Sequence, residues 1–259
     1  MKIIQIKLIY NYDNINNKME WKKVDYINWL KNGAEPNTQV TELYVSHWNH
    51  EYKLNISDIN KLSNLRIIHC AFCNIDNIED LQLPKLRTLM CSNNNITTIE
   101  HIHLPSLQTL CCCSNHITHV NYMQLPNLCK LCFCYNYVTD IEHLDLPMLR
   151  SLRCYQNQVT NIEGLTLPRL NVLMCNYNHI EHIEKLQLPE LRILNCNNNY
   201  IKSIDRLKLP KLQKLKCSYN ELTELVLPFC INVSEIEYTD NPFIYLDLRH
   251  IITNGSVPL

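Results

Sequence analysis

Apolar and polar positions repeat along this chain every 21 residues. Prolines preceded by leucine recur at that spacing, at Pro84, Pro105, Pro126, Pro147, Pro168, Pro189 and Pro210. With each proline as position 0 of a unit, positions 2, 5, 7, 12, 15 and 18 are apolar in nearly every unit. Only a coil that turns all six positions inward gives one continuous core. The pattern therefore predicts a solenoid in which each unit packs on its neighbours.

The same frame extends without insertion to units that begin at Ser63 and Ile231, which gives nine units in phase. A degenerate tenth unit is visible upstream in Val40, Leu43 and Val45, separated from the next by four extra residues. Position 10 is usually asparagine, whose side chain can bond to backbone groups that a tight turn leaves unpaired. We therefore interpret this column as structural: Asn94, Asn115, Asn136, Asn157, Asn178, Asn199, Asn220 and Asn241.

The unit Leu-Pro-x-Leu-x-x-Leu-x-Cys-x-x-Asn-x-Ile-x-x-Ile resembles the leucine-rich-repeat family over roughly residues 38–250. The resemblance implies an α/β repeat solenoid, a curved right-handed coil with a parallel strand ladder on its concave face. The convex face would carry short 3₁₀ or extended turns. The unit is most similar to the subclass of a phosphatase regulatory subunit and of bacterial internalins. The Asn-, Ile- and Lys-rich composition is also similar to mimivirus-like giant-virus repeat proteins, although an AT-rich genome alone produces such a composition.

Three segments are expected. Residues 1–39 form an N-terminal cap, in which residues 1–10 alternate as an edge strand and Lys18–Lys31 form an amphipathic helix that ends near Gly33. Its apolar face is expected to comprise Trp21, Val24, Ile27 or Tyr26, and Leu30. Residues 40–250 form the repeats, and residues 251–259 close the C-terminal end.

The charge balance and the cysteine content restrict the expected partners and the expected cellular compartment. Lys plus Arg number 24 and Asp plus Glu 25, so no global charge excess draws the molecule to nucleic acid or an anionic membrane. The sequence has no run of eighteen apolar residues and no signal-peptide cleavage site, so we expect no membrane association. Most of the 14 cysteines recur once per repeat rather than in close pairs. This predicts a reducing compartment, the cytoplasm, or the host cytoplasm for a viral protein.

Cysteines fall into two groups. Position 7 is expected to point inward as a small buried hydrophobe, at Cys70, Cys91, Cys112, Cys154, Cys175, Cys196 and Cys217. The register of two adjacent strands instead points four cysteines outward as a rectangle on the concave face: Cys111, Cys113, Cys132 and Cys134. Four thiolates suit a closed zinc site, whereas the simpler interpretation is a weakly apolar patch. We expect no cofactor and keep metal binding as the alternative.

The exposed strand surface is predicted to be basic and rich in Tyr and Met, the residue types that concentrate binding energy at interfaces. The predicted partner-binding residues are Arg87, Met90, Arg150, Arg153, Tyr155, Met174, Tyr177, Arg192 and Lys216. Position 16 is acidic instead, at Glu79, Glu100, Glu142, Glu163, Glu184 and Asp205. These carboxylates are expected to accept backbone N–H bonds in the convex turns.

No catalytic motif was found: the sequence has no His-Glu-x-x-His, no phosphate-binding glycine loop and no serine hydrolase elbow. We therefore predict a non-enzymatic protein–protein interaction scaffold whose partner carries an acidic patch. The first alternative is a nucleic-acid binder that uses the basic, Tyr-rich concave face. The second is a metal- or redox-sensitive scaffold that acts through the surface cysteines.

Overall fold

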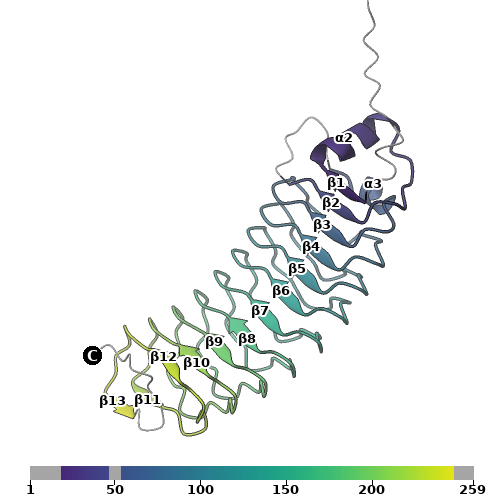
Figure 1. Cartoon of the computed structure of the whole chain (residues 1–259). Coiled ribbons are helices and arrows are strands. Elements are labelled where there is room, and N and C mark those ends of the chain that lie inside the picture. Colours follow the sequence, from purple (N-terminus) through teal and green to yellow (C-terminus); the bar gives the residue numbers. More distant parts are fainter. Residues whose placement is uncertain (1–18, 47–53, 248–259) are drawn as a thin grey trace, which may run out of the picture.

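A computed structural model describes residues 19–46 and 54–247 of the chain. Short parallel strands stack side by side along an elongated coil (Figure 1). Eleven of them form one sheet in chain order: β1 (Glu20–Lys22), β2 (Glu42–Tyr44), β3 (Ile67–His69), β4 (Thr88–Met90), β5 (Thr109–Cys111), β6 (Lys130–Cys132), β7 (Ser151–Arg153), β8 (Val172–Met174), β9 (Ile193–Asn195), β10 (Lys214–Lys216) and β12 (Glu235–Glu237).

Every strand from β3 to β10 occupies positions 4 to 6 of its unit, and the ladder is in register. Leu131 pairs with Leu152, and Leu152 pairs with Leu173. The residue at position 5, leucine in β4 to β10 and Ile68 in β3, is the central residue of each strand and is buried. The side chains at positions 4 and 6 therefore point to the opposite face of the sheet.

The apolar positions predicted from the repeat lie in the core. The unit that begins at Pro168 illustrates this, since each of its six inward positions is at most 1% exposed: Leu170, Leu173, Cys175, Ile180, Ile183 and Leu186. One hydrophobic cluster runs from Trp21 to Val233. The core is thus a single column built by stacking.

The position 10 asparagines form the predicted ladder of turn-stabilising amides. The side-chain amide of Asn157 donates to the carbonyl oxygens of Phe133 (3.1 Å), Cys154 (3.0 Å) and Tyr155 (3.4 Å). Its Oδ1 accepts the backbone N–H of Val138 at 3.0 Å. Because Phe133 and Val138 belong to the preceding unit, each asparagine ties two consecutive turns together.

The N-terminal segment differs from the prediction. The helix α2 (Lys23–Lys31) begins five residues later than expected, where the backbone N–H of Lys22 donates to Asp25 Oδ2 (2.8 Å). Trp21 lies in strand β1, pairs with Leu43 and is fully buried. Tyr26 and Trp29 form the buried helix face, whereas Val24 is 59% exposed. A three-residue strand is too short for its alternation to be distinguished from a helical pattern.

A second short helix, α3 (Ile56–Asn60), begins after Asn55, whose side chain accepts the N–H of Ser57. At the C-terminal end, β11 (Glu224–Val226) and β13 (Tyr245–Asp247) form a separate parallel pair. They occupy positions 14 to 16, opposite the main ladder. The predicted edge strand at residues 1–10 and the closure at residues 251–259 lie outside the described residues.

Elsewhere the side opposite the ladder consists of turns. Each turn is closed by one backbone hydrogen bond between residues three apart. Examples are Leu186 N–H to Ile183 O (3.1 Å) and Leu207 N–H to Ile204 O (3.1 Å). Within residues 19–46 and 54–247, none of these turns extends into a 3₁₀ helix. Within the same residues, no helix is long and apolar enough to cross a membrane.

Candidate functional site

We call the outward side of the sheet the strand face. It is formed by positions 4 and 6 of β3 to β10. It is the surface predicted to be concave. All its strands are parallel and in register, so residues that precede each strand gather along one border and residues that follow it gather along the other. The repeat thus sorts side chains into rows by position number.

The arginine row lies at position 3, immediately before each strand. Its members are exposed and make no ion pair with any described residue: Arg66, Arg87, Arg150 and Arg192. Neutral residues occupy the same position in the other units: Gln108, Cys129, Asn171 and Gln213. Positive charge along this border is therefore discontinuous.

The aromatic row lies on the other border, at positions 9 and 11. These rings are about half exposed: Phe72, Tyr135, Tyr137, Tyr177, Tyr200 and Tyr219. Two of them stack on a histidine of the preceding unit, Tyr137 on His116 and Tyr200 on His179, with ring centroids 6.1 Å and 5.9 Å apart. Unstacked rings such as Tyr177 offer apolar area with a polar tip.

Position 9 has a left-handed backbone in every unit from Phe72 to Asp240, with φ between 53° and 56°. Non-glycine residues rarely adopt this conformation. It turns the chain sharply out of the strand and sets the direction of the aromatic row. This conformation is not evident from the sequence, because the chain has only three glycines and none of them is at position 9.

The predicted partner-binding residues on the strands differ in whether they already form an ion pair. Met90, Arg153 and Met174 occupy position 6 of β4, β7 and β8, and Arg153 is exposed beside Met174 in the ladder. Lys216 is already neutralised, since its Nζ lies 2.7 Å from Glu237 Oε1 on β12. Its neighbour Lys214 pairs with Glu235 in the same way (2.5 Å). At β10 the basic residues predicted for the strand face are therefore paired with carboxylates of β12.

The four cysteines predicted to point outward differ in their exposure to solvent. Cys111, Cys113 and Cys132 are partly exposed, whereas Cys134 is buried. Cys134 stands at position 8, where Tyr155 of the next unit hydrogen-bonds to it. Position 8 still lies on the outer side here, since Cys113 at the same position of the preceding unit is partly exposed and Cys134 Sγ lies 3.6 Å from Cys132 Sγ. Cys134 is buried because neighbouring side chains, Tyr155 among them, cover it.

The three exposed thiols contact one another on β5 and β6. Sγ of Cys113 lies 2.9 Å from Sγ of Cys132 and 3.8 Å from Sγ of Cys111. Hydrogen bonds from Cys111, Cys113 and Cys134 hold the pKa of Cys132 below its ordinary value. Those with Cys111 and Cys132 raise the pKa of Cys113.

Inside the coil, the position 7 cysteines form the predicted buried column. Their thiols point to carbonyl oxygens of the next unit, as Cys196 Sγ does to Lys216 O (3.2 Å). Burial raises the pKa of Cys196 to about 12 and raises that of Cys175 as well. These thiols are therefore protonated and inert at neutral pH.

Comparison with known proteins agrees with this geometry. The family model described as "Leucine Rich repeats (2 copies)" matches residues 84–121 and 189–229. The chain shares the fold of an internalin, InlF, from Listeria monocytogenes (22% identity, TM-score 0.62, covering 81% of this chain and 74% of that one). The fold is a leucine-rich-repeat solenoid.

Two further solved structures share the leucine-rich-repeat fold. The functional domain of InlJ from Listeria monocytogenes, described as including a cysteine ladder, is 24% identical with a TM-score of 0.66 and covers 83% of this chain and 47% of that one. The LRIM1/APL1C complex contains a chain with 19% identity and a TM-score of 0.64, covering 83% and 41%. This chain spans less than half the length of these two. No curated protein sequence matches.

On the turn side of the leucine-rich repeats, the position 16 carboxylates bind backbone as predicted in three units. Glu79, Glu142 and Glu163 accept the N–H of the residue 22 positions further on, at 2.9, 3.0 and 2.9 Å. Gly164 is one of these donors, and a Cβ there would lie 2.7 Å from Glu142 Oε1. Each carboxylate therefore fastens the turn of the next unit.

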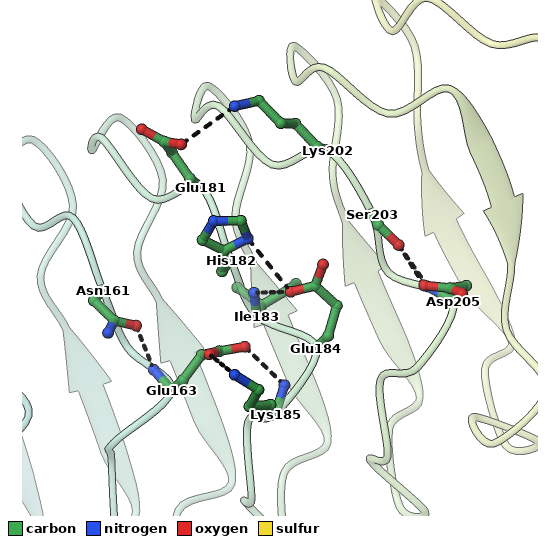
Figure 2. Close-up of polar contacts among 10 residues, drawn as sticks. All are labelled: Asn161, Glu163, Glu181, His182, Ile183, Glu184, Lys185, Lys202, Ser203 and Asp205. Carbon is green, nitrogen blue, oxygen red and sulfur yellow. Dashed lines mark hydrogen bonds and ion pairs between the residues drawn. The ribbon is translucent and has the colours of Figure 1, made fainter.

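Glu100 makes no such bond with a described residue, and the carboxylates after Glu163 bond differently, as Figure 2 shows. Glu184 accepts the N–H of Ile183 in its own turn (3.2 Å) and faces His182 (3.8 Å). Asp205 bonds to Ser203. A shallow hollow of about 490 Å³ lies between these turns. Because the carboxylates bond within their own turns, they leave the hollow without a convergent set of ligands.

Proposed function

We propose that this leucine-rich-repeat solenoid is a non-enzymatic scaffold that binds a protein partner on the strand face between β4 and β9. The observation that carries the proposal is the arrangement of Arg153 and Met174 on the strands between an arginine row and an aromatic row. Arginine, tyrosine and methionine concentrate binding energy because they bury large area and form directed hydrogen bonds.

A partner with an acidic patch fits this surface. Arg87, Arg150, Arg153 and Arg192 are exposed and form no ion pair with any described residue, so their charge is available to a partner. Tyr155 and Tyr177 supply apolar area beside them. Solved neighbours support the class of function: one is described as the LRIM1/APL1C complex, and another as an octameric complex of Latrophilin 3, Unc5D and FLRT2. Fourteen free thiols support a reducing, cytoplasmic setting.

Nucleic acid fits the same surface less well. A single strand needs a positive groove that follows its backbone over successive units. Here the arginine row is interrupted by neutral residues, and Lys214 and Lys216 are paired with glutamates. We therefore expect no retention of single-stranded nucleic acid even at low salt; salt-dependent retention would favour this alternative instead.

The first prediction tests the strand face by charge reversal. The partner is captured from the native cell with the wild-type chain and identified by mass spectrometry, and the captured protein is then purified. Paired substitution Arg153→Glu and Arg192→Glu should weaken its binding by at least about 10-fold, because reversed charges repel an acidic patch. Binding is measured by calorimetry, and the affinity should fall with rising salt for the wild type only.

The matched control is the pair Arg206→Glu and Lys208→Glu on the turn side, which changes net charge by the same amount and leaves the strand face intact. This control should bind like the wild type. Equal binding by the two double variants would place the interface elsewhere.

A further inference from the structure

A group of three thiols stands at the middle of the strand face. Cys111 and Cys132 are direct partners in the ladder of β5 and β6, and Cys113 follows Cys111 by two residues. The sulfur atoms of the three all lie within 4.8 Å of one another. All three are partly exposed, so an ion reaches them from solvent without unfolding of the coil.

The repeat does not require sulfur at these places. Position 6 is His69, Met90, Arg153, Met174, Asn195 or Lys216 in other units, and position 8 is Ser92, Tyr155 or Ser218. All these units form the same strand and turn. Packing therefore does not account for three thiols gathered over one pair of strands.

The distance between two of the sulfurs points to a shared ligand. At 2.9 Å, Cys113 and Cys132 are closer than the roughly 3.5–4.0 Å at which the smaller carbon atoms make their best contact. Three thiolates bound to one zinc ion at about 2.3 Å, with tetrahedral angles, place their sulfurs about 3.8 Å apart. Cys111 and Cys113 already have this separation, and Cys132 needs to move by only about 1 Å.

We propose that Cys111, Cys113 and Cys132 bind a soft metal ion, Zn²⁺ or Cu⁺, through three thiolates. Thiolate sulfur selects these ions over Mg²⁺, Ca²⁺ and Mn²⁺. Each thiol that binds releases its proton to the buffer and gives its sulfur lone pair to the ion, with no change of oxidation state. Arg153, the ladder partner of Cys132, offsets the negative charge of the thiolates.

Cys134 is not one of the ligands in this proposal. Its sulfur is 3.6 Å from that of Cys132, but it is buried and hydrogen-bonded to Tyr155. The remaining coordination position of a zinc ion therefore faces solvent. The site does not depend on the protein-binding proposal, because it is complete in the isolated chain.

The test uses the full chain, reduced and freed of metal under anaerobic conditions. Zn²⁺ is titrated by calorimetry, Co²⁺ by its thiolate-to-metal absorption, and Cu⁺ by competition with a coloured chelator. We expect one equivalent to bind, with proton release, and tight binding in the Cu⁺ assay alone would assign copper. No binding of any of the three ions at micromolar concentration, or a Cys113–Cys132 disulfide in protein kept anaerobic, would overturn the proposal.

Single variants decide the ligand set. Cys111→Ser, Cys113→Ser and Cys132→Ser should each weaken binding by more than about 10-fold, since loss of a second-shell partner alone costs that much. Cys129→Ser and Cys134→Ser should bind like the wild type. Undiminished binding by Cys113→Ser, or loss of binding by Cys134→Ser, would overturn the assignment. Serine already occupies position 8 in Ser92, so unchanged melting temperatures are expected to separate ligand loss from misfolding.

Discussion

At the residue scale, the side chains of the position 10 asparagines connect consecutive turns through hydrogen bonds to the backbone. Asn157 makes four hydrogen bonds to backbone groups of two units, and three of the four are buried. An apolar replacement leaves the buried Val138 N–H without a partner. The three carbonyls each lose one donor and keep another: Asn136 for Phe133, Asn178 for Cys154, and the N–H of Tyr135 for Tyr155. Unpaired buried polar groups are costly, so the column limits which sequences can form the turn.

The second prediction follows from the hydrogen bonds of Asn157. Asn157→Ala should lower the free energy of unfolding by about 3 kcal/mol, because the buried Val138 N–H loses its partner and three further hydrogen bonds to backbone carbonyls are lost. Urea unfolding followed by circular dichroism measures it. Asn171→Ala is the control, since the Asn171 side chain makes no hydrogen bond with any described residue, and it should change stability by less than about 0.5 kcal/mol. Equal effects of the two substitutions would contradict the structural role of the ladder.

At the element scale, the turn after each strand is held in a conformation that its residues do not favour. Gln156, like every position 9 residue, has a positive φ, here 56°. Its backbone N–H donates to Asn176 O (3.1 Å), so the ladder fixes the turn despite the intrinsic cost of the conformation. The strand face gains its aromatic border from this turn.

The third prediction concerns that cost. Gln156→Gly should raise the free energy of unfolding by about 0.5–1 kcal/mol, because glycine removes the penalty of the left-handed conformation. Gln158→Gly, two residues away and equally exposed, should lower it by a similar amount, since there glycine only adds freedom to the unfolded chain. Thermal unfolding of both variants beside the wild type provides the measurement. Destabilisation by Gln156→Gly would show that the turn carries no strain.

At the scale of the whole molecule, the buried thiol column links stability to pH. Burial raises the pKa of Cys196 to about 12, above the ordinary thiol value of about 8.5 in an unfolded chain. The folded state therefore retains a proton that the unfolded state loses. This contribution to stability is fully present below pH ~8.5 and is lost as pH rises toward 12.

The fourth prediction is alkaline destabilisation. The urea midpoint should be constant between pH 7 and 8 and should fall steadily above about pH 9, because several position 7 thiols share the raised pKa. Cys196→Ala should make this fall less steep, although the cavity lowers stability at every pH. A midpoint that falls equally steeply in wild type and variant would assign the effect to other groups. Cys129→Ala, which removes a partly exposed thiol, is the control.

The sequence by itself determined the solenoid, because each of its signals acts within one unit. Six inward positions, the asparagine column and the buried cysteine column recur at fixed spacing, and neighbouring units only repeat the same contact. Position 16 carboxylates were predicted to cap turns, and Glu79, Glu142 and Glu163 do so. Such features need no knowledge of distant contacts.

Only the tertiary structure decided features that depend on contacts between units or on departures from the repeat. The pairing of Lys216 with Glu237 and the burial of Cys134 beside Tyr155 arise between adjacent units. Trp21 became a strand residue because β1 pairs with β2, a contact outside the 21-residue frame. A local pattern fixes which way a side chain points along a regular strand. Contacts between units decide what that side chain meets and whether a neighbour covers it, as Tyr155 covers Cys134.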